Sequence, residues 1–134
     1  KFKTGADGRY WFRSRKPVDY PVPTDGPVGL ILHGTGRHSW RPAHLHYLIY
    51  KDGFQTIQTE MFNSDSKYLD SDAVFGVKES LVIPYNKVED PVRSEEYGFK
   101  GAFYEGLFDF VMKDDASVKD AEAAYSERAS MSSS

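Results

Sequence analysis

The sequence predicts an all-β protein, an antiparallel β-sandwich with long loops and a polar C-terminal tail. Aromatic residues make up 15% of the chain, with nine Tyr and nine Phe, and 11 Gly and 7 Pro separate short apolar runs. Aromatic residues are typical of strands, and Gly and Pro are typical of the turns between strands. The length of 134 residues is that of one domain with one core.

Seven apolar or aromatic runs of strand length lie between the turn residues. We expect strands at Arg9 to Arg15, Val28 to His33, Ala43 to Tyr50, Phe54 to Phe62, Asp72 to Val77, Ser80 to Tyr85 and Phe103 to Met112. The turn Lys51-Asp52-Gly53 joins two of them into a predicted β-hairpin from Ala43 to Phe62. Residues 63 to 71 and 86 to 97 are expected to be loops.

The C-terminal residues differ in composition from the rest of the chain. We expect the sandwich domain to occupy residues 1–112 and a polar tail to occupy residues 113–134. The tail contains one segment with helical character, AEAAYSERA, and a Ser-rich end that has too few apolar residues to form a core. The first residue is Lys1, not Met, and strand-like sequence follows at once, which predicts that the chain starts inside a longer gene product.

Charge and composition argue against several classes of function. The chain has 17 Lys and Arg against 20 Asp and Glu, a formal net charge of -3, with no basic block for nucleic acid. No apolar run approaches the roughly 20 residues of a membrane span, which predicts a soluble protein, and the cytoplasm is the default expectation for its compartment. Because the chain contains no Cys, any metal must be held by His, carboxylate or Tyr oxygen.

The segment Arg41-Pro-Ala-His-Leu-His-Tyr47 carries the most specific chemical pattern. Side chains two residues apart on a strand point to the same face, so His44 and His46 present two adjacent imidazoles. Taken alone, such a pair is more often two ordinary histidines than a metal site. A barrel amidohydrolase is excluded by the chain length, and a cupin by the lack of an acidic residue about four positions further on.

Tyr20 is the candidate for a third ligand. It lies in Asp19-Tyr20-Pro21-Val22-Pro23, where two prolines hold the backbone extended and fix the direction of the phenol ring. A lone Tyr before Pro is usually a loop anchor, so this feature gains weight only beside the histidines.

Longer motifs resemble the intradiol ring-cleavage dioxygenase family. The segments Tyr20-Pro-Val-Pro, Asp25-Gly-Pro-Val-Gly and GRHSWRPAHLH, which ends at His46, look like the core of that family. Gly53-Phe-Gln-Thr and YLDSDAVFGVK, which begins at Tyr68, follow in the same order. The resemblance covers residues 5 to 112 and is most similar to the hydroxyquinol 1,2-dioxygenase branch, with catechol and chlorocatechol 1,2-dioxygenases as neighbours.

The resemblance implies a non-haem Fe(III) held by two tyrosinates and two histidines, of which this chain supplies Tyr20, His44 and His46. The family's other tyrosine lies upstream, and no residue before Tyr10 matches it, so we expect the catalytic C-terminal half of a family member. The family also has an N-terminal helical region that forms a dimer interface, which predicts a homodimer for a full-length relative. Two phenolates and a hydroxide would balance the three positive charges of Fe(III). With only one phenolate, one positive charge is left, and its place would have to be taken by water, a carboxylate or an exogenous anion.

The resemblance also implies a reaction and a set of roles. The substrates would be O₂ and a small aromatic diol or triol, with hydroxyquinol cleaved to maleylacetate as the first expectation and catechol or chlorocatechol cleaved to a cis,cis-muconate as the alternative. Tyr20 would act as a base, Arg41 would stabilise negative charge on the ring, and Val74 would line the substrate pocket. Strict strand alternation places Arg41 away from both histidines, but Pro42 allows a bend.

Other interpretations remain open. Glu60, on the expected partner strand, is either a solvated strand residue or a carboxylate that accepts a hydrogen bond from an imidazole or approaches the metal. The whole chain could be an inactive, metal-poor β-sandwich binding module, or a hydrolase with Zn at the two histidines. Tyrosinate bound to Fe(III) absorbs strongly in the visible range, so colour separates these classes.

Overall fold

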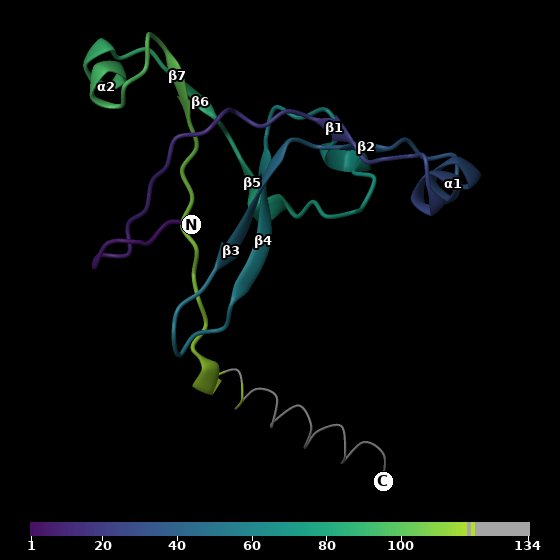
Figure 1. Ribbon diagram of the computed structural model, residues 1–134, viewed down its shortest axis with the longest axis horizontal. Helices are drawn as coiled ribbons and strands as arrows, with labels where there is room; N and C mark the ends of the chain where they lie inside the picture. Colours follow the sequence, from purple (N-terminus) through teal and green to yellow (C-terminus); the bar gives the residue numbers. More distant parts are fainter. Residues whose placement is uncertain (118, 120–134) are drawn as a thin grey trace.

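The computed structural model describes residues 1–117 and 119, and it contains three small β-sheets and two short α-helices (Figure 1). The strands are β1 (Tyr20–Pro21), β2 (Trp40–Arg41), β3 (His44–Ile49), β4 (Ile57–Asn63), β5 (Val82–Ile83), β6 (Asn86–Val88) and β7 (Phe103–Glu105). The helices are α1 (Pro27–Gly34) and α2 (Pro91–Glu96), with 3₁₀ turns at Leu69–Ser71 and Glu79–Leu81. The sheets have the strand orders β1-β2, β3-β4-β5 and β6-β7.

The hairpin of β3 and β4 runs through the middle of the molecule and confirms the hairpin that the sequence predicts (Figure 1). The two strands are antiparallel, and their register places His46 opposite Glu60 and His44 opposite Phe62. Gly53 adopts a φ of 77° in the turn, a conformation that suits a residue without a Cβ. This register fixes which β4 side chains lie beside the two histidines.

The short sheet of β1 and β2 places the Tyr20 segment beside the start of the hairpin. Tyr20 pairs with Arg41, and the amide of Val22 donates to the carbonyl of Ser39 at 2.9 Å. Pro42 has no amide hydrogen to donate to a ladder, and the strand is interrupted between β2 and β3. The chain therefore changes direction between Arg41 and His44.

The strand expected at Val28 to His33 is wrong, because these residues form most of helix α1. Pro27 occupies the start of the helix, where its fixed φ favours helical backbone, and this outweighs the β-branched side chains that suggested a strand. Gly29 is also required here, since a Cβ at this position would lie 1.9 Å from the carbonyl oxygen of Thr24. Helix α1 projects to one side of the hairpin (Figure 1).

The loop expected at residues 86 to 97 is also wrong, because it contains strand β6 and helix α2. The carboxylate of Asp90 accepts hydrogen bonds from the amides of Val92 and Arg93 at 2.9 and 3.1 Å. An Asp before a Pro at the first helical position is a strong start signal for a helix. The described chain is thus rich in sheet and also contains the helices α1 and α2.

Four further strands differ from expectation. Arg9 to Arg15 has no ladder partner within the described chain, although the hydroxyl of Tyr10 donates to the carbonyl of Phe108 at 2.8 Å. Asp72 to Val77 forms turns, whereas Ser80 to Tyr85 and Phe103 to Met112 contain only β5 and β7 as regular strand. Strand β5 pairs with β4 in parallel, so the central sheet is mixed and not purely antiparallel.

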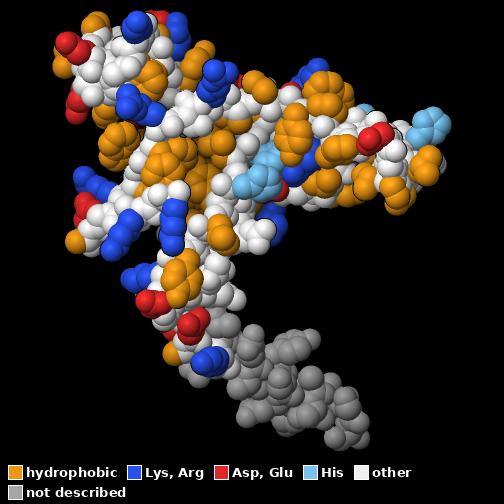
Figure 2. Space-filling model, viewed as in Figure 1, with side chains coloured by type: hydrophobic (Ala, Val, Ile, Leu, Met, Phe, Trp, Pro, Cys, Tyr) orange, Lys and Arg blue, Asp and Glu red, His pale blue; other side chains and the backbone are white. Residues whose placement is uncertain are grey.

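The buried apolar side chains lie mainly beside the hairpin and support the histidine strand. They are Leu32, Ala43, Met61, Phe62, Ala73, Ile83 and Phe103. The rings of Phe62 and His44 lie 5.4 Å apart between centroids, so the imidazole rests on a fully buried aromatic ring. Figure 2 shows that many other hydrophobic side chains reach the surface.

The chain beyond Met112 runs back beside the hairpin turn. The amide of Gln55 donates to the carbonyl of Lys113 at 2.8 Å, and the amide of Asp115 donates to the carbonyl of Gly53 at 3.0 Å. The helical segment expected through AEAAYSERA lies outside the described residues. No helix within residues 1–117 and 119 has the length and apolar character to cross a membrane.

Candidate metal centre

His44 and His46 lie on the same face of β3, as strand alternation predicts. Their ring centroids are 4.9 Å apart; the His44 side chain is 1% exposed and the His46 side chain is 66% exposed. The Nδ1 atom of His44 lies 2.7 Å from the carbonyl oxygen of Pro42. That carbonyl accepts a hydrogen bond from Nδ1–H, so the lone pair is on Nε2 and available to a cation.

Tyr20 reaches the buried histidine from β1. Its Oη lies 3.4 Å from Nε2 of His44, and the two ring centroids are 5.4 Å apart. The Tyr20 residue is 40% exposed, so a small molecule has access to the phenol. The structure thus brings together the three residues that the sequence selects as metal ligands.

Arg41 lies in the same cluster, although strict strand alternation predicts that its side chain points away from both histidines. The interruption at Pro42 turns the guanidinium toward the histidine face, where its NH1 atom lies 3.0 Å from Nε2 of His44. The side chain is buried and donates to two carboxylates, those of Glu60 and Asp72. Although burial alone lowers the pKa of Arg41, these hydrogen bonds raise it above its ordinary value, so the guanidinium stays charged. Burial and the nearby Arg41 charge lower the pKa of His44.

Asp72 is a site residue that the sequence reasoning missed. Its buried carboxylate accepts from Nε and NH2 of Arg41 at 3.1 and 3.3 Å, and from the amides of Val74 and Gly76 at 3.3 and 2.8 Å. Burial raises the pKa of this carboxyl, but the hydrogen bonds from Arg41 and the two amides lower it overall. An Asp followed by a Gly in a segment with turn character was the available signal, because Asp side chains often bond to amides just downstream.

Glu60 connects Arg41 to the two histidines. Its Oε2 accepts from NH2 of Arg41 at 2.7 Å, while its Oε1 lies 3.3 Å from Nδ1 of His46 and 4.0 Å from Nε2 of His44. Burial raises the pKa of Glu60, but the hydrogen bond and charge of Arg41 lower it overall. Potential ligand atoms of His44, His46 and Glu60 all lie within 4.8 Å of one another.

Val74 does not belong to this hydrogen-bonded cluster through its side chain. Its backbone amide donates to Asp72, and the residue is 49% exposed. The loop that carries Val74 is nevertheless anchored to the site, since the Asp72 carboxylate binds both this loop and Arg41. The role of Val74 as a substrate contact stays a prediction.

The donor atoms of the cluster fit a transition-metal cation. Two imidazoles, a phenol oxygen and a carboxylate are ligands that iron, zinc and related ions accept, and no thiolate is required. Ligand atoms of His44, His46 and Glu60 lie within 4.8 Å of one another, and the Tyr20 hydroxyl lies 3.4 Å from Nε2 of His44. A cationic N–H of Arg41 donates toward the same Nε2 atom. A metal ion bound to Nε2 must displace this N–H.

Comparisons with known proteins identify the family of the chain. The family model Dioxygenase_C, described as Dioxygenase, matches residues 1–114. The chain belongs to the intradiol ring-cleavage dioxygenase family. This family implies non-haem iron as the metal, and the site residues listed above lie within the matched region.

Several relatives of this intradiol dioxygenase chain carry names of the hydroxyquinol branch. It is 54% identical over 112 residues to a hydroxyquinol 1,2-dioxygenase of Rhizobium sp. (strain MTP-10005), an alignment that covers 83% of this chain and 38% of the relative. It is 48% identical to a 6-chlorohydroxyquinol 1,2-dioxygenase of Cupriavidus pinatubonensis, covering 72% of this chain and 35% of the relative. The chain thus spans less than half of the length of these relatives.

Solved structures give the same assignment. A hydroxyquinol 1,2-dioxygenase from Pseudomonas putida DLL-E4 superposes with a TM-score of 0.64 at 47% identity, covering 74% of this chain and 35% of that one. A catechol 1,2-dioxygenase from Pseudomonas arvilla C-1 gives a TM-score of 0.73 at 34% identity, covering 81% of this chain and 36% of that one. The similarity therefore extends to the fold as well as to the motifs.

Proposed function

We propose that this chain forms the metal-binding half of an enzyme that cleaves hydroxyquinol to maleylacetate with O₂ at a non-haem Fe(III) centre. The convergence of Tyr20 and Arg41 on one nitrogen of His44 carries this proposal, since it places a base and a cation beside one metal-binding atom. The names of the relatives support hydroxyquinol as the substrate, with catechol or chlorocatechol as the alternative.

Tyr20, His44 and His46 would hold the iron. When bound, the iron supplies electron exchange between the aromatic ring and O₂, which organic side chains do not provide. Because Fe(III) favours phenolate oxygen, bound iron would hold Tyr20 as the phenolate, and the Oη atom of Tyr20 would accept the proton of a substrate hydroxyl. Its partial exposure leaves room for that hydroxyl to approach.

Arg41 would stabilise the negative charge that develops on the substrate ring. Its guanidinium is buried and held by Asp72 on one side and Glu60 on the other, so it needs little reorganisation when that charge appears. We place Val74 at the edge of the substrate pocket, on the loop that Asp72 fixes to Arg41.

For the whole protein we propose a larger assembly than the described sheets. Residues 1–112 would form part of an antiparallel β-sandwich, residues 113–134 would form a polar tail, and the full-length enzyme would be a homodimer. The solved relatives support the larger size alone, because each matched structure is about three times as long as the aligned segment.

The test uses the visible spectrum and the product. Reconstituted anaerobically with iron and oxidised, the chain should show a tyrosinate-to-Fe(III) band. Tyr20→Phe keeps the ring and removes only its oxygen, so it should abolish the band and lower ring cleavage by about 10²-fold or more, followed as oxygen uptake with hydroxyquinol and with catechol. A variant that keeps both colour and activity would make Tyr20 a loop anchor, and a colourless protein that binds Zn would favour the hydrolase interpretation.

A further inference from the structure

We propose that Asp19 is a positioning residue for Tyr20. Its carboxylate ties the segment that carries Tyr20 to the strand that carries His44, and so sets the distance between the phenol oxygen and the imidazole. This segment, residues 17–23, is called the Tyr20 arm. The inference rests on the proposed function and adds a residue outside the ligand set.

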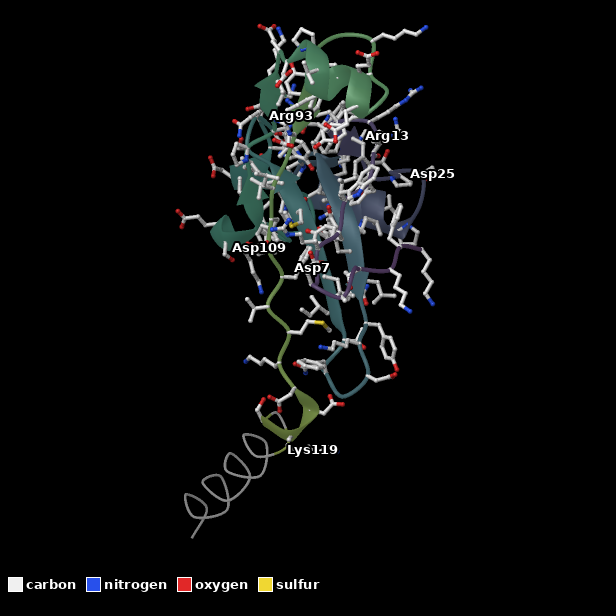
Figure 3. All side chains as sticks on the ribbon, turned by 90° about the vertical axis from the view of Figure 1, so that its left-hand side faces the viewer. Asp7, Arg13, Asp25, Arg93, Asp109 and Lys119 are labelled. Atoms are coloured by element: carbon white, nitrogen blue, oxygen red, sulfur yellow. The ribbon has the colours of Figure 1, made fainter. Side chains whose placement is uncertain are left out.

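The Tyr20 arm meets the hairpin at the end where β3 begins. Arg13 and Asp25, which precede and follow the arm in the sequence, both lie toward this end in Figure 3, whereas Lys119 lies at the opposite end. His44 is the first residue of β3, and β1 lies beside β2 just before it (Figure 1). A contact between the arm and the start of β3 therefore acts on the distance between Tyr20 and His44.

The sheet that attaches the Tyr20 arm is very short. Strands β1 and β2 pair over two residues. Pro21 and Pro23 have no amide hydrogen, so they cannot donate to a neighbouring strand. The amide of Val22 donates to the carbonyl of Ser39 at 2.9 Å, which holds the arm on the downstream side of Tyr20. A contact on the upstream side is needed to fix both ends of this strand.

Asp19 supplies the upstream contact. Its Oδ1 atom accepts from the amide of Ala43 at 2.9 Å and from the hydroxyl of Ser66. Ala43 is 2% exposed, and a buried amide without an acceptor destabilises a protein. The carbonyl of Ala43 accepts from the amide of Asn63 at 2.8 Å, which ties Ala43 to the hairpin. The Asp19 carboxylate therefore takes the place of a strand partner for Ala43.

The bond from Ala43 to Asp19 joins the neighbours of two proposed ligands. Asp19 directly precedes Tyr20, and Ala43 directly precedes His44. Because peptide units are planar and of fixed length, this bond limits how far the Tyr20 backbone can move from the His44 backbone. In the side chains, Oη of Tyr20 lies 3.4 Å from Nε2 of His44, a spacing at which both atoms can reach one cation.

Two conservative variants separate the position of the Asp19 oxygen from its charge. Asp19→Asn keeps an acceptor oxygen at the same distance from the backbone and removes the negative charge. Asp19→Glu keeps the charge but adds one methylene, which displaces the acceptor from the amide of Ala43. A positioning role therefore predicts that Asp19→Asn behaves like the wild type and that Asp19→Glu does not.

The first measurement uses the metal-free chain. The rings of Tyr20 and His44 have centroids 5.4 Å apart, so wild type and Asp19→Asn should show a nuclear Overhauser contact between them. In Asp19→Glu this contact should be lost, and the amide of Ala43 should exchange with solvent at least about tenfold faster. Urea unfolding separates a local effect from loss of the fold. If Asp19→Glu does not fold, the result with Asp19→Asn decides the proposal.

The second measurement is the affinity for Co²⁺, followed by visible absorption. Asp19→Glu should bind at least about tenfold more weakly than the wild type, and Asp19→Asn should stay within about twofold of it. In a Tyr20→Phe background, Asp19→Glu should cause no further loss of affinity, because Asp19 acts through the phenol oxygen. A role in general stability would not produce this dependence on Tyr20.

Asp65→Glu is the matched control. Asp65 accepts from Nζ of Lys16 at 2.7 Å, so it also contacts the chain just before the Tyr20 arm, but its side chain is 64% exposed. The same added methylene at Asp65 should leave the ring contact of Tyr20 and the Co²⁺ affinity unchanged.

Each contrary outcome has a defined meaning. A wild-type ring contact and Co²⁺ affinity in Asp19→Glu would overturn the positioning role, and so would a loss in Asp19→Asn as large as in Asp19→Glu, because charge would then be the cause. Additive losses with Tyr20→Phe would also overturn it. A wild-type chain that binds neither Co²⁺ nor iron would overturn the proposed function, and the ring contact in the metal-free chain would still decide whether Asp19 positions Tyr20.

Discussion

At the scale of residues, the candidate site is organised around Arg41 as much as around the histidines. The guanidinium donates to Asp72 and Glu60 and lies against Nε2 of His44. Asp72 in turn binds the amides of Val74 and Gly76, so one buried carboxylate fixes both the arginine and the neighbouring loop. The network therefore holds the Arg41 charge in one position beside His44.

Asp72→Asn should destabilise the protein strongly at neutral pH. The change removes one charge of a buried pair whose Asp72 side chain is 2% exposed and leaves Arg41 less well compensated, which typically costs about 3–5 kcal/mol. Asp70→Asn, two residues earlier on an exposed side chain, should change the free energy of unfolding by less than about 0.5 kcal/mol. Urea unfolding of both variants measures the difference.

The ion pair of Asp72 and Arg41 makes the free energy of unfolding depend on pH, with a defined sign. The pKa of Asp72 is lowered in the folded state from its ordinary value of 3.8, so its contribution is complete above that value. As pH falls from 3.8 through the lower folded pKa, the contribution of Asp72 to the free energy of unfolding is lost. The gap in stability between wild type and Asp72→Asn should therefore shrink in this acid range; a gap that is constant with pH would mean that Asp72 acts through packing alone.

At the scale of elements, the hairpin and the H-x-H face could be predicted from the sequence because both depend on local spacing. Gly53 marks the turn, and alternation along β3 places His44 beside His46. Helix α1 could not be predicted from apolar patterning, since Pro27 and a close backbone contact at Gly29 decide it. The Asp72 network was missed because it joins residues 31 positions apart, whose proximity depends on tertiary folding.

Two glycines of α1 test what defines this helix. Gly29→Ala would place a Cβ against the carbonyl of Thr24, so it should destabilise α1 by about 1–3 kcal/mol. Gly34→Ala meets no atom within 4 Å and should be neutral or stabilise the helix by about 0.5–1 kcal/mol. Amide hydrogen exchange of residues 30–35 reports the two effects locally. Equal exchange in both variants would show that the Thr24 contact does not limit the helix.

At the scale of the whole molecule, the described chain buries few large side chains and exposes many. Phe62, Met61 and Pro42 are its largest fully buried side chains, whereas Trp11, Leu30, Phe75, Leu107 and Val111 are each more than 70% exposed. Figure 2 shows hydrophobic side chains at many places on the face in view, between charged groups of both signs. Large exposed apolar area is typical of surfaces that contact another protein or another segment.

The chain should therefore self-associate when it is purified alone. Exposed apolar area is removed from water on association, at about 25 cal/mol per Å², and a formal net charge of -3 opposes contact only weakly. Sedimentation velocity at rising protein concentration should show a growing average mass, and a dye that binds apolar surface should fluoresce in its presence. Because apolar contacts drive the process, added salt should not disperse the assemblies, whereas Leu107→Ser together with Val111→Ser should reduce them. A concentration-independent monomer mass, with little dye bound, would show that these side chains are covered in solution by a rearrangement of the extended segments that carry them.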